Sequence, residues 1–255
     1  MGGISVKITN QYGSWTTFKM NGSGGICLTS VGGITPPKAT ISTAEIATKD
    51  GSIFTNAQIG NRNIVLTFDI TGAKPETVRT GLYYYLKVKE PVSLEIKTGT
   101  RTATIDGYVE SINADPFAKG QRVQISVVCP EPYLLGDLMT YTGTGSTNVV
   151  PLSDTSHGAV FTVTLAAASS GLMVSNSATS EAIYLTGDYA ANDVIVIDTR
   201  LGKKSVKKNG ANILGDVDLN LSKWIQLTPY DNNTITVSPN TAVIKVEFNT
   251  LYEGL

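Results

Sequence analysis

The chain has 255 residues, and its 20 Lys and Arg residues nearly balance 21 Asp and Glu residues, which gives a formal net charge of −1. This balance argues against a protein whose main ligand is nucleic acid, because such proteins usually carry an excess of positive charge. The length allows two ordinary domains, and the 25 glycines with frequent Thr, Ser, Val and Ile predict short strands joined by turns.

The first residues, MGGISVKITNQYG, lack a cationic segment followed by an apolar core, and no stretch of the sequence reaches the length of a membrane span. We therefore expect no secretory signal, no membrane insertion and synthesis in the cytosol. Cys27 and Cys129 lie far apart in the sequence. Two distant cysteines favour reduced thiols packed as small apolar groups over a disulfide framework.

A long hairpin is predicted in the first half of the chain, over about residues 38–66. Asp50 and Gly51 lie between two alternating runs, Ile41–Ile46 and Ile64–Ile70, and Asp-Gly is a frequent hairpin turn. The arms of this hairpin are irregular near Asn56–Gly60.

The segment KPETVRTGLYYYLKVKE predicts a helix over about residues 75–89. Pro75 suits the first helical position, Glu76 suits the positive end of the helix dipole, and apolar residues recur at helical spacing up to Pro91. Tyr83, Tyr84 and the tyrosine after them wrap around this helix. At least one of them is therefore expected to be exposed or to lie in an interface.

A domain boundary is predicted near Tyr133–Asn148, because CPEPY cannot continue a central strand and the following YTGTGSTN is small and polar. We assign residues 1–136 to a first domain and residues 137–255 to a second. Strand-like segments recur in the second domain every eight to twelve residues, which is typical of a β-sandwich or jelly roll. These segments are AVFTVTL, GLMVS, EAIYLTG, VIVIDT, WIQLTP, NTITVS and AVIKVEFNTLY.

Five basic residues crowd VIVIDTRLGKKSVKKNGANIL, residues 194–214. Arg200-Leu201-Gly202 predicts a three-residue turn, and Asn209-Gly210 predicts a two-residue turn. The strand between these turns would direct Lys203 and Lys207 to solvent on its outer face, and lysines on such a strand discourage pairing with other chains. We favour this solvated strand over a phosphate-binding patch.

No catalytic, metal or cofactor site is indicated, and we expect no enzymatic activity. The single histidine, His157, lies in a Ser/Gly/Asp-rich segment without a nucleophile elbow, so we expect an exposed loop histidine. No phosphate-binding glycine motif occurs. Asp216, Asp218 and Asn220 copy the start of a calcium loop but lack its glycine and its closing glutamate, which favours a turn.

Trp224 and Tyr230 flank a predicted strand and turn of the second domain. Either aromatic ring could stack on a sugar, but an aromatic residue at strand spacing is more often part of a core. We favour the core interpretation for Trp224.

Several segments together resemble the distal tail proteins of long-tailed, non-contractile phages, above all those of Gram-positive hosts. The resemblance runs along nearly the whole chain, and each segment is weak alone while their order and spacing are informative. The segments are Arg62-Asn63-Ile64, the LYYYL helix, Arg101 leading into IDGYVE, F-x-x-G-Q-R-V-Q-I-S with CPEPY, the basic segment, W-x-x-L-x-P-x-x-N at residues 224–232, and Tyr252-Glu253-Gly254.

The resemblance implies a fold of two parts: an N-terminal β-barrel-like domain with one helix and a long hairpin, and a galectin-like β-sandwich. It implies a hexameric ring at the tip of the tail tube, in which residues 1–136 form the ring and genomic DNA passes through the centre without being held. The expected partners are further copies of the chain, the major tail tube protein, a tail-associated hub, lysin or fibre protein, and receptor-binding proteins anchored at the rim. The expected location is the phage tail tip, after assembly in the host cytoplasm.

By this comparison the hairpin at Asp50 and Gly51 is the candidate that clasps a neighbouring subunit, with Tyr83 and Tyr84 as further interface candidates. Lys203 and Lys207 are candidates for a charged outer surface. The alternative is a carbohydrate-binding adhesion module acting through the second domain, for which Trp224 and Tyr230 are the candidate contacts.

Overall fold

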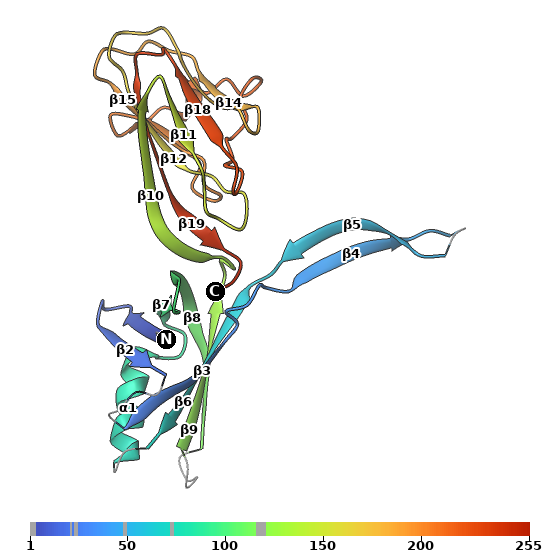
Figure 1. Ribbon diagram of the computed structural model, residues 1–255, viewed down its shortest axis with the longest axis vertical. Helices are drawn as coiled ribbons and strands as arrows, with labels where there is room; N and C mark the ends of the chain where they lie inside the picture. The colour runs from blue at the N-terminus through green and yellow to red at the C-terminus, as the bar shows by residue number, and fades with distance from the viewer. Residues whose placement is uncertain (1–3, 21, 23–24, 48–49, 72–73, 116–120) are drawn as a thin grey trace. The chain divides into compact units, whose positions relative to one another are not determined.

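A computed structural model describes residues 4–255 except 21, 23–24, 48–49, 72–73 and 116–120 (Figure 1). The chain divides into two compact units, one formed by residues 1–136 with 252–255 and the other by residues 137–251. The expected second domain extended to Leu255, whereas the last four residues group with the first unit.

The first unit is a barrel-like antiparallel sheet in the order β2–β1–β7–β8–β9–β6–β3. An isolated bridge between Met20 and Leu28 connects the chain after β2 with β3, so the two edge strands of this sheet approach one another at that point. The strands are β1 Ser5–Asn10, β2 Trp15–Lys19, β3 Ile26–Gly32, β6 Arg62–Ile70, β7 Pro91–Lys97, β8 Thr102–Ala114 and β9 Gln121–Cys129.

The core of this unit follows from strand alternation, since every second residue of β6 is buried from Arg62 to Ile70. Phe68 is fully buried, and its ring meets Phe18 edge to face at a centroid distance of 4.9 Å. Cys129 is a buried free thiol in this core, and Cys27 is a half-buried free thiol.

Helix α1, Pro75–Tyr85, packs against β1 and β6 and buries Leu82. It begins at Pro75 as predicted but ends four residues before the predicted end. Lys89 has a φ of 73°, and its backbone N–H donates to the carbonyl of Val109 at 2.8 Å. This hydrogen bond to β8 replaces the bond that a longer helix would have made.

The predicted hairpin exists, with strands β4 Ala39–Glu45 and β5 Ser52–Ile59 (Figure 1). Its second arm is therefore Ser52–Ile59, and the prediction that Ile64–Ile70 forms this arm was wrong, because those residues lie in β6 between β3 and β9. The pairing shifts by one residue between Ser42 and Thr43, which marks a bulge.

The second unit is a sandwich of two antiparallel sheets, β17–β16–β15–β12–β19–β10 and β11–β18–β13–β14. With the first unit it gives the mostly β architecture predicted from the sequence. Its elements are β10 Leu134–Thr144, β11 Ser146–Val149, β12 Val160–Thr164, β13 Leu172–Asn176, β14 Glu181–Leu185, β15 Val194–Asp198, β16 Ser205–Lys208, β17 Ala211–Asn212, the 3₁₀ helix η1 Leu214–Asp216, β18 Asn233–Ser238 and β19 Val243–Tyr252. The first residues of β10 and the last of β19 belong to the first unit.

The predicted strand WIQLTP is extended chain with one bridge, from Leu227 to His157, rather than a strand of either sheet. The buried side chain of Asn233 explains the difference. Its Oδ1 accepts from the backbone N–H of Thr228 at 2.8 Å, and its Nδ2 donates to the carbonyl of Thr228 at 2.9 Å. A side chain thus takes the hydrogen bonds that a neighbouring strand would have provided.

Candidate assembly surfaces

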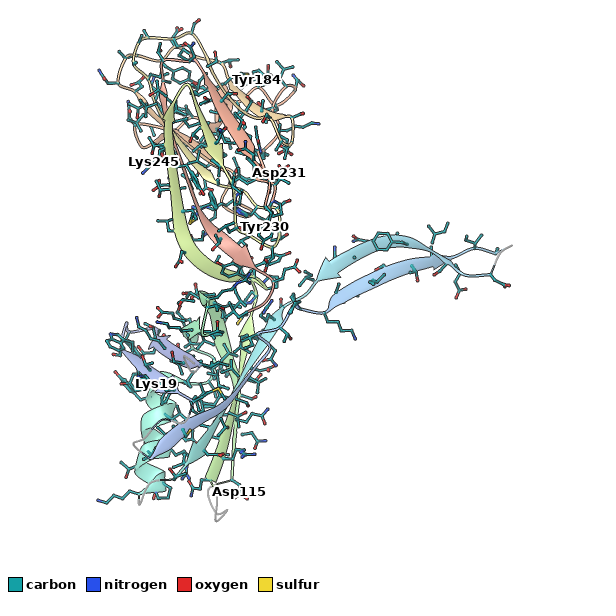
Figure 2. The ribbon with its side chains drawn as sticks, viewed as in Figure 1. Lys19, Asp115, Tyr184, Tyr230, Asp231 and Lys245 are labelled. Carbon is teal, nitrogen blue, oxygen red and sulfur yellow. The ribbon has the colours of Figure 1, made fainter. Side chains whose placement is uncertain are left out.

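The hairpin β4–β5 pairs only with itself among the described strands, and all its strand residues are exposed except the half-buried Ile59 (Figure 2). Ile41 is 64% exposed and Phe54 is 62% exposed. Directly paired residues share a face of a hairpin, so the pairs Ile41–Ala57 and Thr43–Phe54 place these two large side chains on one face. This apolar face was not identified from the sequence, where short polar residues interrupt the apolar ones.

Asp50 and Gly51 lie at the tip of this hairpin, as predicted. Gly51 has a φ of 102°, a conformation that suits glycine, and a Cβ at this position would have open space around it. Asp50 is exposed. The tip can therefore make the sharp turn, but its role in clasping a subunit stays a prediction.

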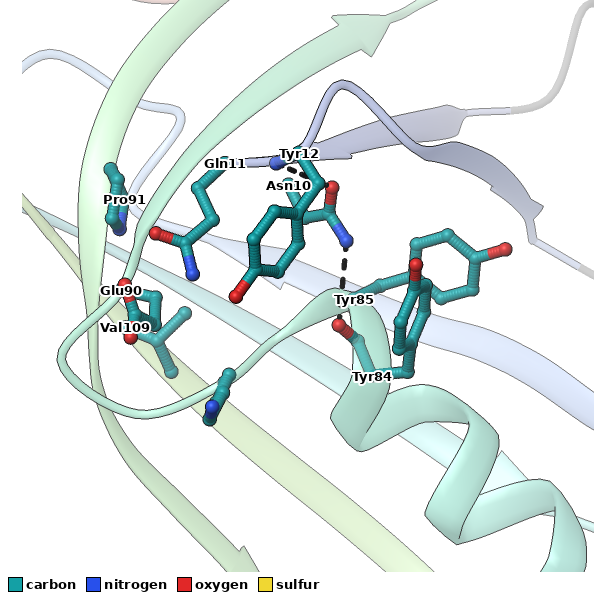
Figure 3. Close-up of a pocket in the computed structure, with 9 residues that line it drawn as sticks. Asn10, Gln11, Tyr12, Tyr84, Tyr85, Glu90, Pro91 and Val109 are labelled. Atoms are coloured by element: carbon teal, nitrogen blue, oxygen red, sulfur yellow. Dashed lines mark hydrogen bonds between the residues drawn. The ribbon is translucent and has the colours of Figure 1, made fainter.

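Tyr84 is 55% exposed on α1, which fits the expectation that one tyrosine of this helix faces solvent, while Tyr83 is half-buried. Together with Tyr12 and Tyr85, Tyr84 lines a shallow notch beside the turn that follows β1 (Figure 3). Asn10 shapes this turn: its Oδ1 accepts from the backbone N–H groups of Tyr12 and Ser14 at 3.1 and 3.0 Å. The exposed Tyr12 was not among the sequence candidates.

The structure of the basic segment differs from the prediction in the position of Lys203. Lys203 lies in the turn, because β16 begins at Ser205, and the loop after β15 therefore spans six residues rather than three. Gly202 has a φ of 73°, and the Asn209-Gly210 turn joins β16 to β17 as predicted. Val206 is buried and Lys207 is exposed, so the solvated strand is observed over Ser205–Lys208.

Three of the five basic side chains contact groups within the second unit. Arg200 forms a two-point ion pair with Asp198, at 3.0 and 2.7 Å. Lys208 pairs with Asp193 at 3.3 Å, and the ammonium of Lys204 lies 5.4 Å from the ring centre of Trp224. Within the described chain, Lys203 and Lys207 make no ion pair and are exposed.

The two acidic partners are held ionised. Burial alone would raise the pKa of Asp198, but hydrogen bonds from the side chain and backbone of Arg200 bring it below its ordinary value. The backbone N–H of Ala190 lowers the pKa of Asp193, and the Asn209 amide and Lys208 add to this effect. The basic segment is thus mainly structural, which supports the solvated-strand interpretation.

Trp224 is half-buried and packs against the sandwich core, with Lys204 over its ring. This environment is the core position favoured from the sequence. Tyr230 is exposed, its φ is 55°, and its hydroxyl donates to Asp154 at 2.8 Å (Figure 2). The described contacts of these two residues give no specific support for a sugar-binding site, and the carbohydrate role stays a prediction.

His157 is buried, so the prediction of an exposed loop histidine was wrong. Its Nε2 lies 2.9 Å from Ser153 Oγ and its Nδ1 lies 2.9 Å from the carbonyl of Gly158. Since a carbonyl can only accept, Nδ1 carries the proton and Ser153 donates to Nε2. Ser153 Oγ in turn accepts from the backbone N–H of Leu251 at 3.0 Å. Burial lowers the pKa of His157, which keeps the ring neutral.

This Ser–His pair has the residue types of a nucleophile and its base, but Ser153 is completely buried and bound to the backbone of β19. Its geometry serves packing rather than attack on a substrate. The described residues contain no cluster of three or more metal-binding side chains, and none of the helices described is long and apolar enough to cross a membrane.

Comparison with known proteins gives two matching family models. The phage tail protein RIFT-related domain matches residues 14–129, and the C-terminal domain of the siphovirus-type tail component matches residues 153–252. No curated protein matches the sequence.

Among solved structures, the chain is similar to the SPP1 Dit (gp 19.1) protein, described as a paradigm of the hub adsorption apparatus in phages that infect Gram-positive bacteria. The sequence identity is 15%, the TM-score is 0.74, and the match covers 96% of this chain and 98% of the other. A chain of the phage P2 baseplate in its activated conformation with Ca has 10% identity and a TM-score of 0.47, with 96% and 97% of the two chains covered. The corresponding P2 structure with Sr gives 10% and 0.48, with 99% of both chains covered.

Proposed function

Because this chain belongs to the siphophage distal tail protein family, we propose that it is the structural hub at the distal end of a phage tail, a hexameric ring that joins the tail tube to the baseplate or tail-tip adhesion apparatus. The first unit forms the ring and leaves a central channel for DNA. The chain is a non-enzymatic component of the virion, assembled in the host cytoplasm. Its partners are five further copies of itself, the major tail tube protein, a tail-associated hub, lysin or fibre protein, and receptor-binding proteins.

The observation that carries this proposal is the hairpin β4–β5, which has an apolar face and which pairs with no other strand among the described residues. An isolated two-stranded hairpin is at best marginally stable in water, and three strands or a covering element are normally needed. A neighbouring subunit can provide both, since it can cover Ile41 and Phe54 and can pair with an open strand edge. The hairpin is therefore better suited to an assembled state than to a free monomer.

The second proposed contact is the notch around Tyr84 and Tyr12. Exposed tyrosines are enriched in protein interfaces, because their large rigid rings bury much area at a small entropic cost. In this proposal Asp50, Gly51, Tyr83 and Tyr84 lie in contacts between subunits, while Lys203 and Lys207 lie on the outer surface and contact an acidic face of another tail protein.

The near-neutral charge suits a channel protein. A net charge of −1 gives no general attraction for phosphate, and strong attraction would retain DNA during its passage. Specific nucleic-acid binding is not part of the proposed function.

The mass of the purified protein in solution tests the proposal. Light scattering or mass photometry should find six copies, and negative-stain microscopy should find rings with an open centre. A variant in which Ala39–Ile59 is replaced by a short Gly/Ser linker should be a folded monomer. The matched control is the double variant Lys203→Glu and Lys207→Glu, which should keep the ring. A wild-type protein that stays monomeric at high concentration, also with tail tube protein present, would contradict the proposal.

A further inference from the structure

Three segments that carry the family resemblance, Arg62, Arg101 and Tyr252–Gly254, meet at one place in the first unit. The resemblance alone gave them no role. In the structure they surround the strap, which we define as residues 33–38, the connection from β3 to the hairpin strand β4. Both arginines bind backbone carbonyls of the strap or of the last four residues of the chain.

Arg62 is the centre of this arrangement and is only 3% exposed. Its Nη1 donates to the carbonyls of Gly33 at 3.0 Å and Thr35 at 3.4 Å, both in the strap. Its Nη2 donates to the carbonyl of Glu253 at 2.6 Å. A single buried side chain thus joins the strap to a segment 191 residues further along the chain.

The chain end is fastened at further points. Arg101 Nη1 donates to the carbonyl of Gly254 at 3.2 Å, and its guanidinium lies 4.5 Å from the ring centre of Tyr252. The backbone N–H of Leu255 donates to the carbonyl of Ile34 at 2.9 Å. Gly254 packs so closely on the strap that a Cβ there would lie 2.8 Å from the ring of Pro36.

The chemistry of the two arginines fits a fastening rather than a binding site. A guanidinium presents several donors in a fixed planar fork, which suits carbonyl groups that converge from different segments. Such charge-assisted bonds are stronger than neutral ones, and a partly open position would leave a buried cation without compensation. We therefore expect the loss of one of these contacts to weaken the others.

The strap is the only described connection between the barrel strand β3 and the hairpin strand β4, and Arg62 also begins β6, the barrel strand that follows the hairpin. The hydrogen bonds between Arg62 and the strap therefore hold together the two segments that connect the hairpin to the barrel. A hairpin held at its base loses less conformational entropy when it docks.

We propose that Arg62, Arg101 and residues 252–255 form a latch that holds the base of the hairpin β4–β5 and presets it for docking on a neighbouring subunit. Arg62 is the central positioning residue and acts through the strap. The latch rests on the proposed function, because the docking partner is a second copy of the chain. It makes the last residues of the sequence part of the assembly machinery of the N-terminal unit.

The test compares wild type with a chain truncated before Tyr252 and with the variants Arg62→Met, Arg62→Lys and Arg101→Gln. The control is Arg122→Met, which removes an exposed arginine of the same unit that binds the half-buried Asp69. The first measurement is the rate at which trypsin cleaves after Lys38, the last strap residue, at concentrations where the protein is monomeric. The second is the mass in solution at high concentration.

Loss of the latch should raise the cleavage rate after Lys38 by about tenfold, because proteolysis follows the population of the locally open strap. Arg62→Lys should behave like Arg62→Met, since an ammonium group cannot span the three carbonyls. Arg122→Met should cleave like wild type. In the latch variants the ring should form only at about tenfold higher concentration or more, while circular dichroism stays that of a folded protein.

An unchanged cleavage rate in the truncated chain and in Arg101→Gln would overturn the latch. A loosened strap with unchanged ring formation would also overturn it, because the latch would then not prepare docking. If Arg62→Met does not fold, the truncated chain and Arg101→Gln decide the question. If wild type never forms a ring, the proposed function fails on its own, and the trypsin measurement still shows whether the strap is fastened.

Discussion

Replacing Phe54 by serine should weaken the assembly of the proposed ring without weakening the fold of the subunit. The Phe54 side chain is 62% exposed in the single chain, so its truncation removes little internal packing. Full burial of such a side chain stabilises by about 1.5–3 kcal/mol, so covering the exposed part contributes roughly 1–2 kcal/mol for each contact between subunits. A closed ring of six contains six such contacts. Because the substitution weakens all six contacts by this amount, the concentration at which half of the chains are assembled should rise roughly 10- to 60-fold.

Mass photometry over a dilution series measures this concentration, and differential scanning fluorimetry of the dilute protein measures the stability of the subunit. The matched control is Leu201→Ser, which removes an equally apolar side chain that is 87% exposed in a turn of the second unit. This control should leave both values unchanged. A contact of Phe54 between subunits is refuted if Phe54→Ser destabilises the dilute subunit enough to account for the weaker assembly, or if Leu201→Ser weakens assembly equally.

Three further predictions concern the second unit. As pH falls below about 6.5 the free energy of unfolding should fall, because burial lowers the pKa of His157 in the folded chain and the unfolded chain therefore protonates this residue at a higher pH. Urea unfolding at a series of pH values should show that the free energy of unfolding depends less on pH in His157→Gln than in wild type, and an identical pH dependence would refute the assignment. Asn233→Ala should lower the free energy of unfolding, measured with urea, by about 2–4 kcal/mol, because it leaves several buried backbone groups without partners. The control Asn232→Ala, at the exposed neighbouring position, should change this free energy by less than about 0.5 kcal/mol. Trp224→Ala should lower the free energy of unfolding by about 1–3 kcal/mol, because packing and the contact with Lys204 are lost. It should not change binding on a glycan array. If wild type binds a sugar and this variant does not, the alternative function as a carbohydrate-binding module would be supported instead.

The sequence predicted the parts of this fold that local chemistry determines. Asp50-Gly51 and Asn209-Gly210 mark turns because few residues tolerate a positive φ, and Pro75 marks the helix start because it lacks a backbone N–H. The second arm of the hairpin was missed because Ser52–Ile59 lacks a buried face and therefore lacks the alternation by which strands are recognised. A strand that is exposed on both faces has no such signal of its own.

The errors at His157 and at the chain end have a different cause, since both depend on contacts between residues far apart in sequence. His157 is buried through Ser153, whose hydroxyl is held by the backbone of Leu251, and nothing near His157 in the sequence reveals this. The return of residues 252–255 to the first unit likewise depends on Arg62 and Arg101. Turn chemistry can be read locally, but these polar anchors can be found only once the sheets are assembled.

The residues that carry the family resemblance acquire a common physical meaning from these contacts. Arg62 and Arg101 donate to carbonyls of the strap and the chain end, and Asn233, directly after the W-x-x-L-x-P-x-x-N segment, holds the backbone at Thr228. Each fixes irregular backbone that no neighbouring strand pairs, and an unpaired buried carbonyl or N–H group would be costly. Apolar core positions accept many side chains of similar volume, whereas few side chains can bind backbone groups from separate segments. A resemblance carried by such anchors therefore indicates how the chain is fastened, and the proposed latch rests on the anchors at the strap.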